Sequence, residues 1–226
     1  MTSESVVAII LARGGSKGIP KKNVRLFGGS PLVEWCLNAA LKSQKIDSVI
    51  LSSDSEEILD CGRKLNCEIH KRSEAHSQDT TTSEESMLAV IEEHPIAQSA
   101  EVLILVQPTS PFTKPEDFDA ALDLFELGEY DSLVTGVSDH SFSWEIDETG
   151  NAIPKYNPKS RPRRQDMKSF RKENGAFYIT KRKIWKEEKC RLGGKIGFYV
   201  MEPYQSIEID SEFDWILLEQ IINHNF

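Results

Sequence analysis

Cysteine is scarce in this 226-residue sequence, and its four cysteines follow no pairing pattern. Cys36, Cys61, Cys67 and Cys190 include no C-x-x-C pair, and no histidine cluster complements them. A structural zinc site needs such spacing, and disulfide frameworks are typical of short, cysteine-rich chains. We therefore expect neither, and interpret the four residues as small core or half-buried thiols.

Long hydrophobic runs and an excess of positive charge are also missing. No apolar run approaches the roughly 18 residues of a membrane span. Residues 1–5 lack the basic head, apolar stretch and cleavage site of a signal peptide. The net charge of −9 argues against a chain built as a whole for nucleic acid or an anionic membrane. We expect a soluble, intracellular protein without a membrane or nucleic-acid partner.

Strand-like and helix-like segments alternate along the first part of the chain. The β-branched run 6–11 is typical of a strand buried on both faces of a parallel sheet, and the very apolar run 102–106 is predicted to be central. The other predicted strands are 49–51, 68–70 and 132–137, and the predicted helices are 31–43, 53–65, 82–93 and 113–127. Ser53 with Glu56, and Thr113 with Glu116, are predicted helix caps. This alternation predicts an α/β fold with a doubly wound, mostly parallel sheet.

The alternation breaks between residues 139 and 173, where polar and aromatic residues alternate among prolines and many cations. About 35 residues is long for a structureless loop. We interpret the segment as an arm inserted into a single domain of 226 residues, built as a β-hairpin extension. The parallel pattern is then predicted to resume in strands 176–179, 196–201 and 207–209, before a last helix from Ser211.

A glycine-rich, basic loop follows the first predicted strand: residues 11–23, Leu-Ala-Arg-Gly-Gly-Ser-Lys-Gly-Ile-Pro-Lys-Lys-Asn. In an open α/β sheet, ligands bind beyond the carboxyl ends of the strands, and the first loop is the usual phosphate holder. Its glycines let the backbone approach a phosphate, and Arg13, Lys17, Lys21 and Lys22 supply cations. The loop matches neither the P-loop nor the dinucleotide-binding pattern. A solvated basic turn is the alternative.

A second polar segment, Gln-Pro-Thr-Ser-Pro at residues 107–111, follows the predicted central strand. It should face the same crevice, where Gln107 and Ser110 could hydrogen-bond a polyhydroxy ligand, although an ordinary turn explains it equally well. Further on, alternation in the predicted strand 207–209 places Glu208 and Asp210 on one face. Two carboxylates near a triphosphate are the hard oxygen ligands that Mg²⁺ prefers, and a polar strand face is the alternative.

The arm reverses the charge of the chain. Residues 155–172 contain eight Lys or Arg residues and one Asp, a net charge of +7. Such a run could be solvated, bind nucleic acid, or clamp a carboxylate through Arg163, Arg164 and Gln165, because paired guanidinium groups suit that geometry.

Together these segments resemble the CMP-N-acetylneuraminic acid (CMP-sialic acid) synthetase family of nucleotidyltransferases. The resemblance covers nearly the whole chain and also rests on residues 52–54, Arg72, 79–83, 173–178 and 206–210. Residues 161–166, 193–195 and 213–215 are more similar to animal-type members than to bacterial ones.

The resemblance implies an N-acylneuraminate cytidylyltransferase, which joins CTP and sialic acid into CMP-sialic acid and releases pyrophosphate with Mg²⁺. It also implies a homodimer in which the arm helps close the partner's active site, and it leaves open whether two dimers associate into a dimer of dimers. Activation of a related nonulosonic acid (KDN, legionaminic or pseudaminic acid) stays open, as does a nucleic-acid-binding protein on an inactive transferase fold. A nuclear rather than cytoplasmic location is open for an animal-type member, since residues 159–164 look like an import signal.

The resemblance carries over roles residue by residue. Arg13, Lys22 and Asp210 are the expected catalytic residues, with Asp210 and Glu208 as Mg²⁺ ligands. The family usually has Asp where Glu208 stands, which leaves the number of metal ions open. The expected substrate-binding residues are Leu11, Ala12, Ser16, Lys17, Asn23, Arg72 and Ser83 for the nucleotide, Gln107, Asn174, Tyr178, Lys195 and Phe198 for the sugar, and Arg163, Arg164 and Gln165 for the sugar carboxylate or leaving phosphates. No general base is identified.

Overall fold

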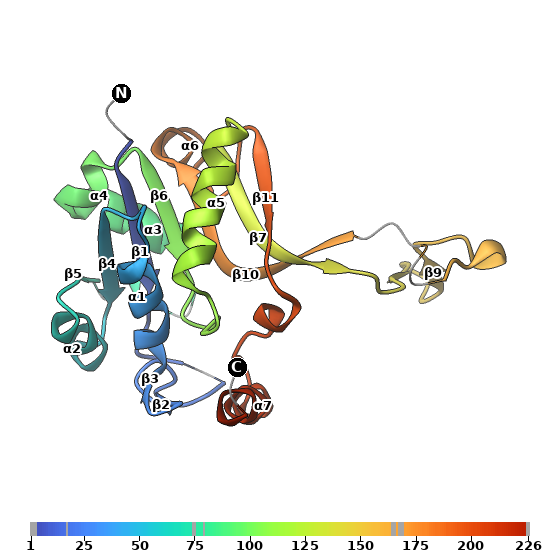
Figure 1. Cartoon of the computed structure of the whole chain (residues 1–226), viewed down its shortest axis with the longest axis horizontal. Coiled ribbons are helices and arrows are strands. Elements are labelled where there is room, and N and C mark those ends of the chain that lie inside the picture. The colour runs from blue at the N-terminus through green and yellow to red at the C-terminus, as the bar shows by residue number, and fades with distance from the viewer. Residues whose placement is uncertain are drawn as a thin grey trace.

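A computed structural model describes residues 4–16, 18–73, 76–78, 80–163, 166 and 170–224. Its centre is a seven-stranded sheet of order β11-β7-β10-β6-β1-β4-β5. The strands are β1 (Val6–Leu11), β4 (Ser48–Ser53), β5 (Glu68–Lys71), β6 (Val102–Val106), β7 (Ser132–Asp139), β10 (Phe170–Lys181) and β11 (Ile196–Val200). The predicted doubly wound, mostly parallel α/β fold is confirmed, and the apolar strand β6 does lie in the middle of the sheet (Figure 1).

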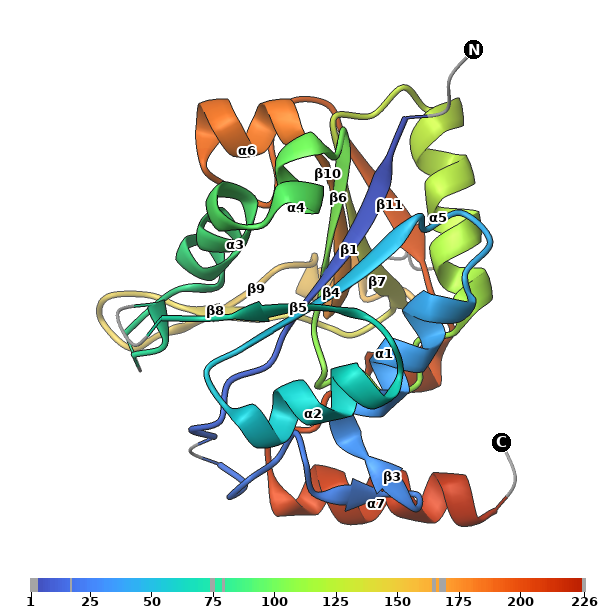
Figure 2. The same ribbon diagram turned by 90° about the vertical axis from the view of Figure 1, so that its left-hand side faces the viewer.

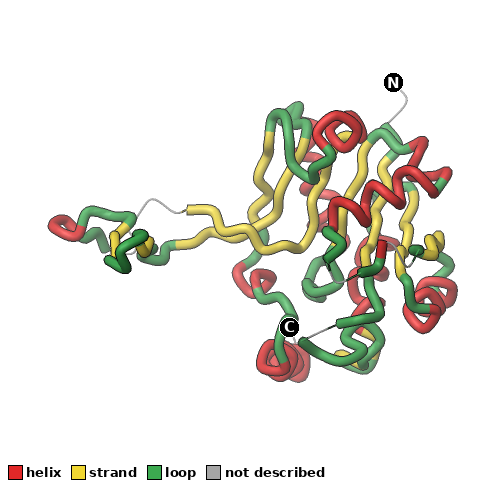
Figure 3. Tube along the Cα trace, turned by 180° about the vertical axis from the view of Figure 1, so that it is seen from behind, coloured by secondary structure: helices red, strands yellow, loops and turns green. Residues whose placement is uncertain are grey.

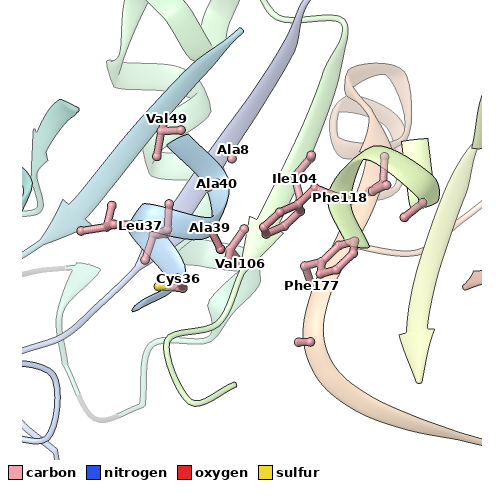
Figure 4. Close-up of a cluster of buried hydrophobic side chains, with 14 of the residues drawn as sticks. Ala8, Cys36, Leu37, Ala39, Ala40, Val49, Ile104, Val106, Phe118 and Phe177 are labelled. Carbon is pink, nitrogen blue, oxygen red and sulfur yellow. The ribbon is translucent and has the colours of Figure 1, made fainter. Parts of the chain in front are cut away.

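Helices cover both faces of the sheet, as Figure 2 shows. One face packs against α1 (Leu32–Lys42), α2 (Glu56–Lys64) and α5 (Pro115–Leu127), and the other against α3 (Ser83–Glu93), α4 (Pro95–Ser99) and α6 (Arg182–Glu188). The first layer holds the larger cluster, in which Leu37 of α1 and Phe118 of α5 are fully buried, and the ring centres of Phe118 and Phe177 lie 4.5 Å apart (Figure 4). Burying such side chains stabilises the fold by about 1.5–3 kcal/mol each.

A third, smaller cluster lies beyond the carboxyl ends of the parallel strands. There α7 (Glu212–Asn223) and the short ribbon of β2 (Leu26–Phe27) and β3 (Ser30–Pro31) pack below the sheet in Figure 1. Ile19, Phe27, Ile209 and Trp215 are almost completely buried between them. This cluster fixes the glycine-rich loop and the acidic segment against one another.

Three local predictions are wrong. β10 pairs antiparallel with both β6 and β7, so the parallel pattern does not resume at residues 176–179. Residues 207–209 form no strand, although Ile209 is buried and Asp210 exposed. The two predicted helix caps are displaced: α2 follows Ser55, and α5 follows Lys114, whose backbone N–H donates to the Asp117 carboxylate.

The segment between β7 and β10 projects away from the sheet, as Figures 1 and 3 show from opposite sides. β7 and β10 stay paired out to Asp139 and Phe170. Beyond them lie the hairpin of β8 (Trp144–Ile146) and β9 (Ala152–Pro154) and the 3₁₀ turn η2 (Pro158–Ser160). The arm has its own small aromatic cluster, in which the Arg161 guanidinium stacks 4.1 Å from the ring centre of Phe142. Among the described residues, no helix has the length and apolar character that crossing a membrane requires.

Candidate active site

The glycine-rich loop leaves β1 at the carboxyl edge of the sheet and folds back on itself. The backbone N–H of Gly14 donates to the Asp54 carboxylate (2.8 Å), and the buried Asn23 side chain donates to the backbone oxygen of Arg13 (2.9 Å). Ile19, fully buried, anchors the middle of the loop. These contacts hold the backbone around Arg13 and Ser16 in a turn open to the crevice.

The acidic segment forms the opposite wall. The Ile209 N–H donates to the backbone oxygen of Thr109 (2.9 Å), which joins this segment to the loop after β6. The Lys22 ammonium donates to the backbone oxygen of Ile209 (2.7 Å) and to the Asp210 carboxylate (3.2 Å). A Cβ atom on Gly18 would lie only 2.5 Å from the Asp210 backbone oxygen, so only glycine permits this close approach of the two segments.

A cavity of about 250 Å³ opens between these walls. It is lined by Leu11, Arg13, Ser16, Gly18, Lys22, Asn23, Pro108, Thr109 and Asp210. All three residues predicted to be catalytic are therefore brought together, along with Leu11, Ser16 and Asn23. Ala12 instead is fully buried and donates its N–H to the backbone oxygen of Ser52. The cavity combines cationic side chains with an exposed carboxylate, the combination that suits a phosphate chain with a divalent cation.

Glu208 is half-buried beside this cavity. Burial, followed by the repulsion of the Asp210 carboxylate, raises the pKa of the Glu208 carboxyl above its usual range. Gly175 allows this arrangement, because a Cβ there would lie 2.8 Å from Gln107 Oε1 and 2.9 Å from Glu208 Oε1. Gln107 and Glu208 thus meet at the irregular part of β10, where Gly175 has a φ of 65°.

Glu208 and Asp210 form an acidic pair that could supply some, but not all, of the oxygen ligands of a Mg²⁺ ion. Among the described residues, no group of three or more His, Cys, Asp or Glu side chains could hold a metal ion. Mg²⁺ is commonly bound by one or two carboxylates together with substrate phosphates. The mutual repulsion of Glu208 and Asp210 would be relieved by a cation between them, so the pair suits a metal that arrives with its nucleotide.

Arg72 lies next to the glycine-rich loop, in a second depression of about 480 Å³ that Asp54 also lines. Its buried guanidinium donates to the backbone oxygen of Ser52 (2.9 Å), the Ser52 hydroxyl (3.3 Å) and the Ser86 hydroxyl (3.4 Å). Burial lowers the pKa of Arg72, while the nearby Asp54 carboxylate opposes that shift. The side chain is thus fixed by neutral acceptors, and its charge is available to an anionic or polar ligand.

Tyr178 belongs to the core cluster under α3 and α6, and the partly buried Phe198 packs against that cluster. The Tyr178 hydroxyl donates to the Glu173 carboxylate, and the Arg191 guanidinium lies 4.9 Å from the centre of its ring. Burial, followed by the hydrogen bond to Glu173, raises the pKa of Tyr178, so it stays protonated. Arg191 also makes a bidentate pair with Glu84 (2.5 and 2.9 Å), next to the predicted Ser83 at the first turn of α3.

Other predicted residues lie elsewhere. The Asn174 side chain is 1% exposed and bonds Thr135, Gln205 and Met201, so it supports β10 rather than facing the cavity. Lys195 lies at the opposite, amino edge of the sheet, where its ammonium donates to Gly128. Arg163 is on the arm. Lys17, Arg164 and Gln165 lie outside the described residues.

Sequence reasoning placed Asp54 and Thr109 in motifs without giving them a role, and did not single out Glu84 or Arg191. Asp54 directly follows β4 and Thr109 follows β6, so their positions after strands were the available signal. Nothing in the sequence pattern indicates the Glu84–Arg191 pair, because its members are far apart along the chain.

The sequence is similar to a known protein family and to several known proteins. The family model described as cytidylyltransferase matches residues 7–222. The chain is 37% identical to N-acylneuraminate cytidylyltransferase A of Danio rerio over 96% of the chain, but over 51% of that protein. It is 35% identical to N-acylneuraminate cytidylyltransferase of Oncorhynchus mykiss, again over half of the relative. The chain thus spans about half the length of these curated relatives.

A bacterial relative is matched along its whole length. The CMP-N,N'-diacetyllegionaminic acid synthase of Legionella pneumophila is 30% identical over 97% of both chains. Among solved structures, a CMP:2-keto-3-deoxy-manno-octonic acid synthetase in complex with CTP shares the fold, with a TM-score of 0.70 at 16% identity, covering 98% of this chain and all of that one. Family model, full-length relative and fold agree with the phosphate-type cavity, and the chain belongs to the cytidylyltransferase family.

Proposed function

We propose that this chain transfers the cytidylyl group of CTP to sialic acid, forming CMP-sialic acid and pyrophosphate. The observation that supports this best is the cavity in which Arg13 and Lys22 face Asp210 across the glycine-rich loop. We propose sialic acid as the sugar because two fish relatives of this chain are N-acylneuraminate cytidylyltransferases.

In the proposed reaction, the anomeric hydroxyl oxygen of the sugar attacks the α-phosphorus of CTP. A new carbon–oxygen–phosphorus link forms, the bond from the α-phosphorus to the bridging oxygen breaks, and pyrophosphate leaves while the hydroxyl loses its proton. Lys22 and Arg13 neutralise the charge on the phosphate chain. Such positioned charges commonly contribute 10²–10³-fold to a rate, or about 2.7–4 kcal/mol each.

The other residues have binding roles in this proposal. Leu11, Ser16 and Asn23 bind the ribose and phosphates, since they line the cavity, and Arg72 and Ser83 bind nearer the base. Gln107, Tyr178 and Phe198 face the sugar. Glu208 and Asp210 hold Mg²⁺, which when bound withdraws charge from the phosphate oxygens. Lys22 pairs with the Asp210 carboxylate, so a bound metal would compete with this contact.

A related nonulosonic acid is the second candidate substrate. The legionaminic acid synthase of Legionella pneumophila is a relative matched over 97% of its length, whereas the fish proteins are more similar in sequence. Pyrophosphate release with CTP and a panel of N-acetylneuraminic, KDN, legionaminic and pseudaminic acids decides between them. The highest kcat/KM with N-acetylneuraminic acid supports the proposal, and no release with any of the four acids contradicts it.

We further propose that the arm serves a second copy of the chain in a homodimer. The arm projects away from the sheet of its own chain (Figure 1), and it carries Arg163, which we propose acts at the cavity of the second copy. If Arg163→Ala and Lys22→Ala proteins are both inactive, mixing them should restore activity through hybrid dimers with one intact site. A mixture that exchanges subunits and stays inactive contradicts the proposal.

A further inference from the structure

A second cavity, of about 530 Å³, opens on the α1 and α5 side of the molecule. This volume is within the range of about 300–1,000 Å³ for small-molecule sites. Its walls come from α1, the residues before and at the start of α5, the turn η4 (Pro203–Ser206) and the end of α7. Its lining shares no residue with that of the catalytic cavity.

Three partly exposed aromatic rings line this cavity: Trp35, Phe112 and Tyr204. Each ring is fixed by neighbours. The Trp35 indole N–H donates to the backbone oxygen of Phe27 (2.9 Å), and the Phe112 and Tyr204 rings pack edge to face with centres 6.0 Å apart. Rigid aromatic walls around an open space favour a flat apolar ring as the ligand, because stacking then costs little side-chain entropy.

The charges at the cavity favour an anion. Lys42 and Lys114 line it and are exposed, and Lys114 lies 5.4 Å from the centre of the Tyr204 ring. Glu34 is the one acidic residue in the lining. The Glu34 carboxylate lies close to Cys61 of α2. The pKa of the Cys61 thiol is raised mainly by burial and next by the charge of Glu34. Two cations therefore face the opening in a chain whose net charge is −9.

The walls of this cavity continue directly into the catalytic cavity. Phe112 comes three residues after Thr109, and Tyr204 comes six residues before Asp210. Two hydrogen bonds tie these strips together: Gln205 donates to the backbone oxygen of Phe112 (2.8 Å), and Ile209 donates to that of Thr109 (2.9 Å). A ligand that binds against the Phe112 and Tyr204 rings would therefore act on the two segments that continue to Thr109 and Asp210 of the catalytic cavity.

Ser110 lies between the two cavities, and its environment makes the present conformation of this loop less stable. It is 3% exposed, and its hydroxyl finds no hydrogen-bond partner among the described residues. A buried unpaired hydroxyl destabilises a conformation, because it has lost its hydrogen bonds to water without replacing them. A small shift of the loop that gives this hydroxyl a partner would remove this destabilisation.

We propose that this second cavity is a regulatory site for a small aromatic anion, a flat ring that carries one phosphate or carboxylate group. The rings of Trp35 and Tyr204 hold the flat part, and Lys42 and Lys114 hold the charge. Binding shifts the loop at Thr109 and the segment at Asp210, and so changes the affinity for CTP. The effect on CTP rests on the proposed function, whereas the binding itself does not.

Phenyl phosphate is a suitable probe, with phenol and inorganic phosphate as the ring and the charge alone. Binding is measured by saturation-transfer NMR on the full chain, first without CTP. We expect phenyl phosphate to bind at least about tenfold more tightly than either fragment. Asn38→Phe, which fills the cavity from α1, should weaken this binding, whereas Leu41→Phe on the same helix but outside the lining should not.

Charge variants test the anion. Lys42→Gln with Lys114→Gln should reduce phenyl phosphate to the level of phenol, whereas Lys64→Gln on α2 should have no effect. Binding that CTP displaces and Asn38→Phe leaves intact would place the probe in the catalytic cavity and overturn the proposal, as would no binding at all.

The final measurement is turnover. Phenyl phosphate should change the KM for CTP by about fivefold or more, the lower end of typical allosteric coupling, and Asn38→Phe should abolish that change. Binding without any change in KM would refute the regulatory role. Absence of turnover in the unmodified chain without the probe would instead contradict the proposed function, so the two failures are distinguishable.

Discussion

Lys22 offers the sharpest test of the catalytic cavity, because its contacts allow a separate prediction for stability and for turnover. The Lys22 side chain is 14% exposed, and its ammonium bonds the backbone oxygen of Ile209 and the Asp210 carboxylate. Lys22→Met keeps the length of the side chain and removes both contacts.

The stability loss comes mainly from one of these contacts. A hydrogen bond from a charged donor to a carbonyl contributes about 1.5–3 kcal/mol. The Asp210 side chain is 70% exposed, so that ion pair is screened by water and contributes only about 0.2–1 kcal/mol. The free energy of unfolding should therefore fall by about 2–4 kcal/mol, and Tm by about 4–16 °C for a domain of this size.

Turnover should fall further than stability explains. Removing a cation that acts on the transition state commonly costs about 10²–10³-fold in kcat. Coupled pyrophosphate release with CTP and N-acetylneuraminic acid measures kcat below the unfolding transition, and urea unfolding measures stability. Lys21→Met is the matched control, since the Lys21 side chain is 72% exposed and pairs only at the surface with Glu57. A Lys22→Met protein that loses stability but keeps kcat within a few-fold would show that Lys22 is only a tether.

Four further changes test the acidic segment and its contact with the glycine-rich loop. Asp210→Asn removes one charge with little change in volume, so it should nearly eliminate turnover and raise the Mg²⁺ concentration needed; an unchanged Mg²⁺ titration places the metal elsewhere. Glu208→Asp restores the residue usual in the family and should stay active in the same titration, and an inactive protein would contradict this. The raised pKa of Glu208 means that its ionisation destabilises the fold as pH rises from the ordinary value of about 4.3 through the folded-state value. Glu208→Gln should therefore unfold at higher urea than the parent at pH 7 but not at pH 4, and an equal difference at both values would refute this. Gly18→Ala forces a Cβ to 2.5 Å from the Asp210 backbone oxygen, so it should raise the KM for CTP and cost about 1–3 kcal/mol; unchanged kinetics would mean that the two walls need no close contact.

Sequence patterns predicted the parts of the fold whose signal is local. The buried run of β6 and the position of the glycine-rich loop after β1 follow from hydrophobicity and from the rule for open α/β sheets. Strand direction is not local. The apolar run at residues 176–179 is the same whether a strand runs up or down, and the arm returns the chain at the edge where it left, which makes β10 antiparallel.

The segment before α7 shows a second limit. Alternation of Ile and acidic residues predicted a strand with Glu208 and Asp210 on one face. Ile209 is buried and Asp210 exposed, but Glu208 is half-buried and the segment forms no strand, because alternation carries no information about pairing. Its hydrogen-bond partners are the Thr109 backbone and the Lys22 side chain, which are distant in sequence and so were not predictable from this segment. Arg13, Lys22 and Asp210 were nevertheless predicted together, because a resemblance to known sequences encodes contacts that periodicity does not.

The paired strands β7 and β10 have a mechanical consequence. They are the two connections between the arm and the sheet, and β10 passes Gly175, beside Gln107 and Glu208, before it enters the core. A two-stranded ribbon bends and twists as one unit. The pairing of β7 and β10 is irregular between Glu173 and Tyr178, so we expect the ribbon to bend there. A displacement of the arm would therefore also move the side chains around Glu208 and Asp210. A protein that binds the tip of the arm, such as a second copy of the chain, could cause such a displacement.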